Sequence, residues 1–247
     1  MPEAWELKTD DSRSENTTTT FIIFCEDEND EPSYFRTFNV EGKLRVNPIE
    51  NQRHGKLNLL NTIEKCEKDG LMEFKDGKFH TLSGITEHIW CVYDRDLEYE
   101  DLKLIKKKDD IDFTSAISLA TYGGLHVAWS NDAFELWILL HFEDVPTGQR
   151  LHRNYIYSRL TEILKTATPR TPELDIITVH PRFNYKNRFK KQGEFYKHIY
   201  PLLEGKREIA VERAINLEAI YNNNIPFHDR NPCTTVHHLV SELIKYQ

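Results

Sequence analysis

Carboxylates follow two apolar segments of the chain at the point where each segment ends. Asp94 and Asp96 follow the run His88–Tyr93, and Glu26 follows the run Thr17–Cys25. Because residues i and i+2 of an extended segment point to the same side, Asp94 and Asp96 can reach one metal ion. Mg²⁺ and Mn²⁺ prefer such oxygen ligands. The sequence therefore predicts an acidic Mg²⁺ or Mn²⁺ site, with Glu26 as a further ligand or as a general acid or base.

Acidic residues after strands are also common in solvated loops. A metal site is therefore expected only if the strands that carry these carboxylates belong to one sheet. Apolar β-branched and aromatic runs predict strands over Thr17–Cys25, Lys43–Val46, His88–Tyr93 and Leu125–Trp129. Helical spacing predicts helices over Pro32–Phe38, Lys56–Lys68, Ile111–Ala120 and Ala133–Phe142, with a hairpin or loop over Leu71–Gly84. This alternation predicts an α/β fold with a mainly parallel sheet, in which ligands gather at the carboxyl ends of the strands.

After about Glu143 helical patterns dominate. They predict helices over Asn154–Thr166, Gln192–Leu203, Arg207–Asn222 and Thr235–Tyr246, separated by Pro-containing stretches at 168–172 and 224–232. We therefore expect a lead-in over residues 1–16, an α/β core over 17–143, and a mainly helical C-terminal part over 144–247 that packs on the core.

Composition limits the class of protein. The chain has 247 residues, 39% hydrophobic residues and a formal net charge of −8, which argues against a generally basic nucleic-acid coat protein. The sequence has no apolar run long enough to span a bilayer and no signal peptide, and its four cysteines form no C-x-x-C pair. These features predict a cytoplasmic protein. No P-loop motif is present, so the chain is not itself a P-loop ATPase.

Two polar residues lie in the apolar helix predicted over 133–142. Glu135 either faces the metal site or binds a backbone amide near the helix start, since buried carboxylates need a partner. His141 points about 120° away from Glu135, which favours a core or interface histidine outside the acidic site.

Two further segments have alternative interpretations. Lys186, Arg188, Lys190 and Lys191 form a basic stretch with interleaved aromatic residues, which could contact nucleic acid or simply be solvated. Asn231–Thr235 resembles a turn into the last helix, where Thr234 or Thr235 would cap free amides, or where the helix start would face phosphate.

The order of strand, Glu, helix, strand and D-x-D resembles the Toprim fold of topoisomerases, primases and overcoming-lysogenization-defect nucleases. At the level of individual residues, the sequence is similar to the RloB family, which consists of Toprim-like proteins linked to restriction loci and phage defence. The segments that carry this resemblance are Phe21–Phe35, Ile89–Asp96, Trp129–Phe142 and Asn231–Val240.

The resemblance implies that Glu26, Asp94 and Asp96 are the Toprim acidic residues. It also marks Glu31, Asn131, Glu135 and Asn231–Thr235 as family signatures, and the first three could contact the metal ligands without binding the ion themselves. The chain departs from the family at Asp27, where Gly usually follows the first Glu.

We therefore expect a Mg²⁺- or Mn²⁺-dependent Toprim nuclease that cleaves RNA, including tRNA, or DNA in antiviral defence. The resemblance implies a partner ATPase of the AAA or ABC type, and a homodimer is also expected. The alternatives are a non-catalytic Toprim-like binding or effector module and a nucleotidyl or phosphoryl transferase.

Overall fold

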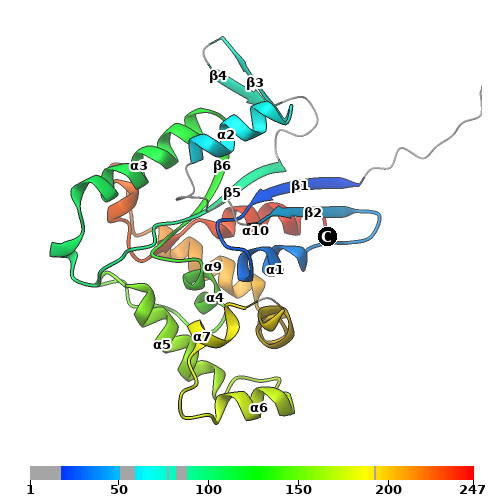
Figure 1. Cartoon of the computed structure of the whole chain (residues 1–247), viewed down its shortest axis with the longest axis vertical. Coiled ribbons are helices and arrows are strands. Elements are labelled where there is room, and N and C mark those ends of the chain that lie inside the picture. The colour runs from blue at the N-terminus through cyan, green and yellow to red at the C-terminus, as the bar shows by residue number, and fades with distance from the viewer. Residues whose placement is uncertain (1–17, 51–58, 77, 82–87, 192) are drawn as a thin grey trace, which may run out of the picture.

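The computed structural model describes residues 18–50, 59–76, 78–81, 88–191 and 193–247, so the predicted lead-in lies outside the described residues. The main feature is a five-stranded sheet with the strand order β2-β1-β5-β6-β7 (Figure 1). Its strands are β1 (Thr19–Phe24), β2 (Leu44–Ile49), β5 (Ile89–Asp94), β6 (His126–Asn131) and β7 (Cys233–Thr234). A separate hairpin consists of β3 (Met72–Lys75) and β4 (Lys78–Thr81).

The four strands from the first part of the chain run parallel, and only β7 is antiparallel to its neighbour β6. In this register Phe24 lies beside Cys91, and Asp94 lies beside Ser130. The carboxyl ends of β1, β5 and β6 therefore meet at one edge of the sheet, as the sequence pattern predicts. The predicted α/β class with a mainly parallel sheet is confirmed.

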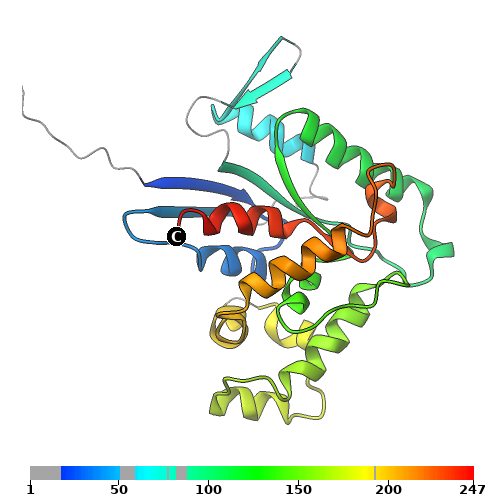
Figure 2. The same cartoon turned by 180° about the vertical axis from the view of Figure 1, so that it is seen from behind.

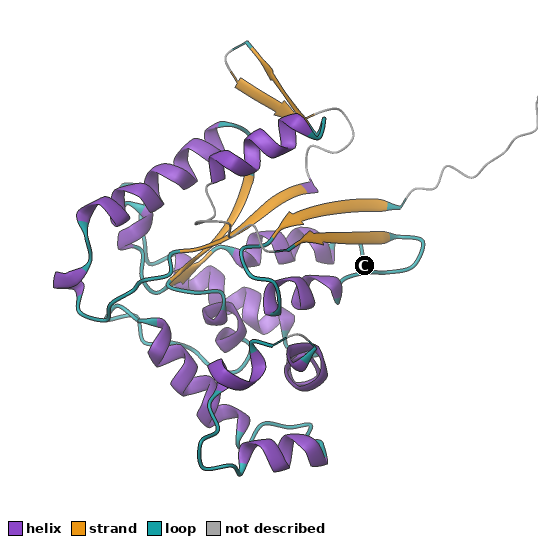
Figure 3. Ribbon diagram, viewed as in Figure 1, coloured by secondary structure: helices purple, strands orange, loops and turns teal. Residues whose placement is uncertain are grey.

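Alternation along β5 places its side chains on the two faces of the sheet. Trp90 and Val92 pack into one hydrophobic cluster, whereas Ile89 and Cys91 pack into the other. The helices that cover the second face are α2 (Leu59–Lys68) and α3 (Lys107–Tyr122). Figure 3 shows these two on one side of the sheet and most of the remaining helices on the other.

The helices of the first face come from both ends of the chain. They are α1 (Asp30–Arg36), α4 (Glu135–Leu140), α5 (Arg153–Leu164), α6 (Pro172–Thr178), α7 (Tyr185–Phe189), α8 (Tyr200–Leu203), α9 (Arg207–Glu218) and α10 (Val236–Ile244). Their buried residues share one cluster with β1, β2, β5 and β6. The C-terminal part thus contributes both helices and a strand, β7, to the layer that holds the acidic strand ends.

Some boundaries differ from those expected from the sequence. β2 extends through Pro48, which an edge strand tolerates because one row of its backbone amides has no ladder partner. The helix predicted over 192–203 is divided into a π-helical segment, Phe195–Ile199, and α8. A short helix, α6, lies in a stretch for which no helix was predicted. Its start is stabilised by Thr171, whose hydroxyl accepts a hydrogen bond from the amide of Leu174 over 3.1 Å.

Two further short segments complete the described chain, the 3-10 turns Leu102–Leu104 and Phe227–Asp229. Cys25, Cys66, Cys91 and Cys233 are all buried free thiols. Within the described ranges, no helix has both the length and the apolar character needed to cross a membrane.

Candidate acidic metal site

Glu26 and Asp94 meet where β1 and β5 end. The backbone amide of Asp94 donates a hydrogen bond to Oε2 of Glu26 over 3.1 Å. Both side chains face a cavity of about 350 Å³, which Asp96 also lines. The three carboxylates predicted from the sequence therefore border one cavity at the carboxyl edge of the sheet.

Asp94 is the most enclosed of these groups. Its Oδ2 accepts a hydrogen bond from the amide of Phe134 over 2.7 Å, while its Oδ1 is buried without a hydrogen-bond partner among the described residues. Burial raises the pKa of Asp94 well above its usual value, and the nearby carboxylates of Glu31 and Glu26 raise it further. A cation would stabilise the charged form at this position.

Asp96 is oriented differently from the sequence expectation. Its φ of 55° is left-handed, so Asp94 and Asp96 do not lie in one extended segment. Its carboxylate pairs with the guanidinium of Arg153, the first residue of α5. Asp96 would therefore reach a shared metal ion from a turn, and it has an arginine as a counterion.

Asp132 holds this turn in place. Its Oδ1 accepts a hydrogen bond from the amide of Leu97 over 2.6 Å, and its Oδ2 accepts one from the amide of Arg153 over 3.0 Å. Its backbone carbonyl accepts a hydrogen bond from the amide of Asp96 over 3.1 Å. One fully buried side chain thus fixes the turn after β5 to the start of α5.

Glu31 and Asp27 form the border of the site beyond Glu26. Oε2 of buried Glu31 accepts a hydrogen bond from the amide of Asp27 over 3.2 Å. Oδ1 of Asp27 in turn accepts hydrogen bonds from the amides of Asn29 and Asp30, over 2.5 and 3.2 Å. Asp27 has no positive φ, so the backbone at this position does not require a glycine.

Lys190, from the C-terminal part, is the counterion of two buried carboxylates next to the site, those of Glu135 and Asp30. Nζ of Lys190 lies 2.6 Å from Oε1 of Glu135 and 3.9 Å from Oδ2 of Asp30, and both carboxylates are buried. Burial acts to lower the pKa of Lys190, but the charges of Asp30 and Glu135 outweigh it and raise that pKa. Glu135 therefore has a charged partner, not the backbone amide that was one expectation.

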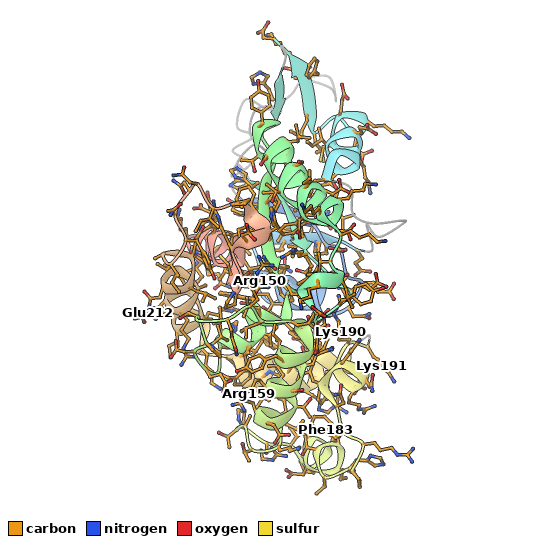
Figure 4. All side chains as sticks on the ribbon, turned by 90° about the vertical axis from the view of Figure 1, so that its left-hand side faces the viewer. Arg150, Arg159, Phe183, Lys190, Lys191 and Glu212 are labelled. Atoms are coloured by element: carbon orange, nitrogen blue, oxygen red, sulfur yellow. The ribbon has the colours of Figure 1, made fainter. Side chains whose placement is uncertain are left out.

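The rest of the basic stretch has other surroundings. Nζ of Lys186 lies 5.6 Å from the centre of the Tyr157 ring, and Arg188 pairs with Glu194 over 2.9 Å. Lys191 is exposed. Figure 4 shows this part from the side, with Lys190 and Lys191 labelled. Nucleic-acid contact by these residues stays a prediction. The ammonium group of Lys190, however, is paired with the carboxylates of Glu135 and Asp30.

Other predicted residues have structural contacts. Nδ2 of buried Asn131 donates hydrogen bonds to the carbonyls of His228 and Arg230, over 3.1 and 3.0 Å. His141 is a core histidine, as expected, with its ring 3.0 Å from the carbonyl of Trp137. The hydroxyl of Thr235 accepts a hydrogen bond from the amide of Trp129 over 2.9 Å and does not cap α10. The hydroxyl of Thr234, the other predicted cap, accepts one from the amide of Val236, the first residue of α10, over 3.3 Å.

Sequence reasoning missed Asp132 and Arg153 as parts of the site. Arg153 lies 57 positions from Asp96, and no local pattern joins them. Lys190 was noted as a basic residue, but only the fold brings it to Glu135.

Comparison with known proteins supports the family that the sequence resembles. No curated protein and no solved structure gives a significant match to this chain. A family described as RloB-like protein matches residues 21–243, which include Glu26, Asp94, Asp96 and every element of the five-stranded sheet except the start of β1. This match covers most of the 247 residues, and the chain therefore belongs to the RloB-like protein family.

Proposed function

We propose that this protein is a metal-dependent nuclease of the Toprim type that hydrolyses phosphodiester bonds of RNA, including tRNA, or of DNA. The observation that carries the proposal is the meeting of Glu26 and Asp94 at one cavity, where Oδ1 of Asp94 is buried without a hydrogen-bond partner in the described part of the chain. Such an arrangement of carboxylates is costly without a cation.

The residues fit Mg²⁺ or Mn²⁺. Asp94, Glu26 and Asp96 supply hard oxygen ligands, and the buried Oδ1 of Asp94 has no hydrogen-bond partner among the described residues. When bound, the ion would neutralise charge on the scissile phosphate and position the attacking water. Glu26 is the candidate general base, because it lies at the cavity and its Oε2 is held by the amide of Asp94.

Other side chains of the cavity suit a nucleotide. The rings of Tyr93 and Phe113 stack with their centres 5.3 Å apart and form an apolar wall. Lys106 lines the same cavity and could pair with a phosphate. A cavity of about 350 Å³ accommodates one nucleotide unit, so the substrate strand would enter with a single phosphodiester at the carboxylates.

The family resemblance supports a wider proposal. We place the nuclease in antiviral defence, under the control of a partner ATPase of the AAA or ABC type, and we expect it to act as a homodimer. The partner ATPase would then determine when the acidic site binds its nucleic-acid substrate.

A second candidate function is a non-catalytic Toprim-like binding or effector module of an ATPase-containing complex. The pairing of Asp96 with Arg153 favours it, because the arginine already neutralises one of the three predicted ligands. Metal binding without cleavage would be its signature.

The test incubates the full chain with tRNA, single-stranded RNA, single-stranded DNA and duplex DNA in Mg²⁺, in Mn²⁺ and with a chelator. We expect metal-dependent cleavage that falls at least about 100-fold in Asp94→Asn and Glu26→Gln. Asp144→Asn is the matched control, since that carboxylate is 84% exposed and pairs only at the surface with Arg213.

Cleavage that survives in both site variants would refute the nuclease assignment to this site. Metal binding by calorimetry that depends on Asp94, with no cleavage of any substrate alone or with the partner ATPase, would establish the second candidate.

A further inference from the structure

A groove lies outside the acidic site, between α9, α10 and the amino-terminal parts of β5 and β6. Its volume is about 650 Å³, and its lining includes Trp90, His126, Glu218, His237 and His238. Trp90 and His126 stack with ring centres 4.8 Å apart. Figure 2 shows α10 (red) and α9 (orange) side by side against the sheet. The groove therefore lies away from the carboxyl strand ends that carry Asp94.

Three side chains of this groove converge on one point. Oε2 of Glu218 lies 3.1 Å from Nε2 of His237 and 2.9 Å from Nε2 of His238. Ligand atoms of all three residues lie within 4.8 Å of one another. In a tetrahedral zinc site with bonds of about 2.0–2.1 Å, neighbouring ligand atoms are about 3.3 Å apart. The two distances from the Glu218 carboxylate differ from that value by only a few tenths of an ångström.

The hydrogen bonds of His237 define which ring nitrogen carries a proton. Nδ1 of His237 lies 3.1 Å from the carbonyl oxygen of Thr234, which only accepts hydrogen bonds, so Nδ1 must donate. In the neutral ring Nε2 then carries no proton, and its lone pair faces the carboxylate oxygen of Glu218. Two acceptors at this distance need a positive charge between them, either a second proton on the ring or a metal ion.

The surroundings favour the metal ion. The side chain of His237 is only 3% exposed, and a bound cation would offset the cost of burying it beside the Glu218 carboxylate. The Thr234 carbonyl also has the role of the outer partner that orients a metal-bound histidine.

We propose that Glu218, His237 and His238 bind a divalent transition-metal ion, with Zn²⁺ as the expected occupant. Two imidazoles and one carboxylate are a ligand set suited to Zn²⁺ and poorly suited to Mg²⁺, which prefers oxygen. Three protein ligands leave the fourth position to water or to a ligand in the groove, where His238 is half-exposed. The ion would join the end of α9 to the start of α10.

The experiment is calorimetric titration of the full chain with Zn²⁺ in the presence of excess Mg²⁺, which occupies oxygen-only sites. We expect one equivalent of Zn²⁺ per chain. Co²⁺ at the same site should give the visible absorption of a tetrahedral complex with nitrogen and oxygen ligands.

The variants separate the ligands from their neighbours. Glu218→Gln and His238→Ala should each weaken Zn²⁺ binding about 10- to 100-fold or more. His238 is 51% exposed, so its truncation tests the site even if changes at buried His237 prevent folding. Glu242→Gln is the matched control, because Glu242 lines the same groove and pairs with Lys245, outside the proposed ligand set.

The result is independent of the proposed nuclease activity. Asp94→Asn should leave Zn²⁺ binding unchanged, whereas Glu218→Gln should leave Mg²⁺ binding at the acidic site unchanged. The proposal is overturned if Zn²⁺ does not bind, or if it binds equally to the parent, Glu218→Gln and His238→Ala. An imidazolium at His237 at neutral pH, detected by NMR in the presence of Zn²⁺, would also overturn it.

Discussion

The amide of Asp94 donates a hydrogen bond to the carboxylate of Glu26 over 3.1 Å, so the end of β5 is joined to the first residues after β1. This contact orients Glu26 and also brings two carboxylates together in a place that water hardly reaches. Repulsion between them is the physical basis of the first prediction.

Asp94→Asn should stabilise the protein without metal while it removes metal binding. The substitution keeps an oxygen that can accept from the amide of Phe134, but it removes the charge that Glu31 and Glu26 repel. We expect the melting temperature to rise by about 2–6 °C, as for other substitutions of strained site residues. Thermal unfolding with and without Mg²⁺ measures this. An unchanged or lower melting temperature without metal would show that the carboxylates are not in conflict.

Lys190→Met should destabilise the protein strongly. It leaves the buried carboxylates of Glu135 and Asp30 without their counterion, and breaking a buried pair in this way costs about 2–4 kcal/mol in the free energy of unfolding. Lys191→Met is the adjacent control and should have almost no effect, because Lys191 is exposed. Urea unfolding measures both variants.

The double variant Lys190→Met with Glu135→Gln checks the cause. It should recover part of the lost stability, because it removes the carboxylate nearest to Nζ. Additive losses in the double variant would contradict the pairing of these two residues.

Asp27→Ala should cost about 1 kcal/mol, because it removes the oxygen that accepts from the amides of Asn29 and Asp30 at the start of α1. Asp27→Asn keeps an acceptor oxygen and should lose much less. Chemical unfolding of the two variants distinguishes the cap from the charge. If the Asn variant is as unstable as the Ala variant, the charge of Asp27 matters more than its hydrogen bonds.

His141 should make the stability depend on pH in the acidic range. Burial in the core lowers the pKa of His141 to about 3, below its usual value of 6.5. A histidine that stays neutral when folded but binds a proton when unfolded stabilises the fold above pH 6.5, and this contribution is lost as the pH falls towards 3. The loss approaches about 1.4 kcal/mol per pH unit.

Raised carboxyl pKa values at Asp94 and Glu31 act in the opposite direction, because those groups bind protons more tightly in the folded state. The effect of His141 is therefore measured as the difference between the parent and His141→Gln, by urea unfolding from pH 7 down to about pH 4. Parallel curves for the two proteins would mean that His141 is protonated in the folded state or exposed.

The sequence was most informative where periodicity and local chemistry coincide. Buried strands that end in acid predicted both the parallel sheet and the meeting of Glu26 with Asp94, because strands of one direction end at one edge. The match to the RloB-like protein family over residues 21–243 includes both of these residues.

Other parts of the site depend on contacts that have no local pattern. β7 has two residues, too few for an alternation to be recognised, yet it completes the sheet. The left-handed turn at Asp96 is stabilised by Asp132 and Arg153, which follow other elements of the chain. Lys190 is part of an ordinary basic stretch until the fold brings it to Glu135.

The position of Lys190 has a consequence for synthesis on the ribosome. When β1, β5, β6 and α4 have emerged, Asp30 and Glu135 still lack their cation, and the exposed edge of β6 lacks Cys233 and Thr234. The buried acids of the amino-terminal half therefore gain their counterion, and β6 its outer neighbour, only after Lys190 and then Cys233 and Thr234 have been synthesised.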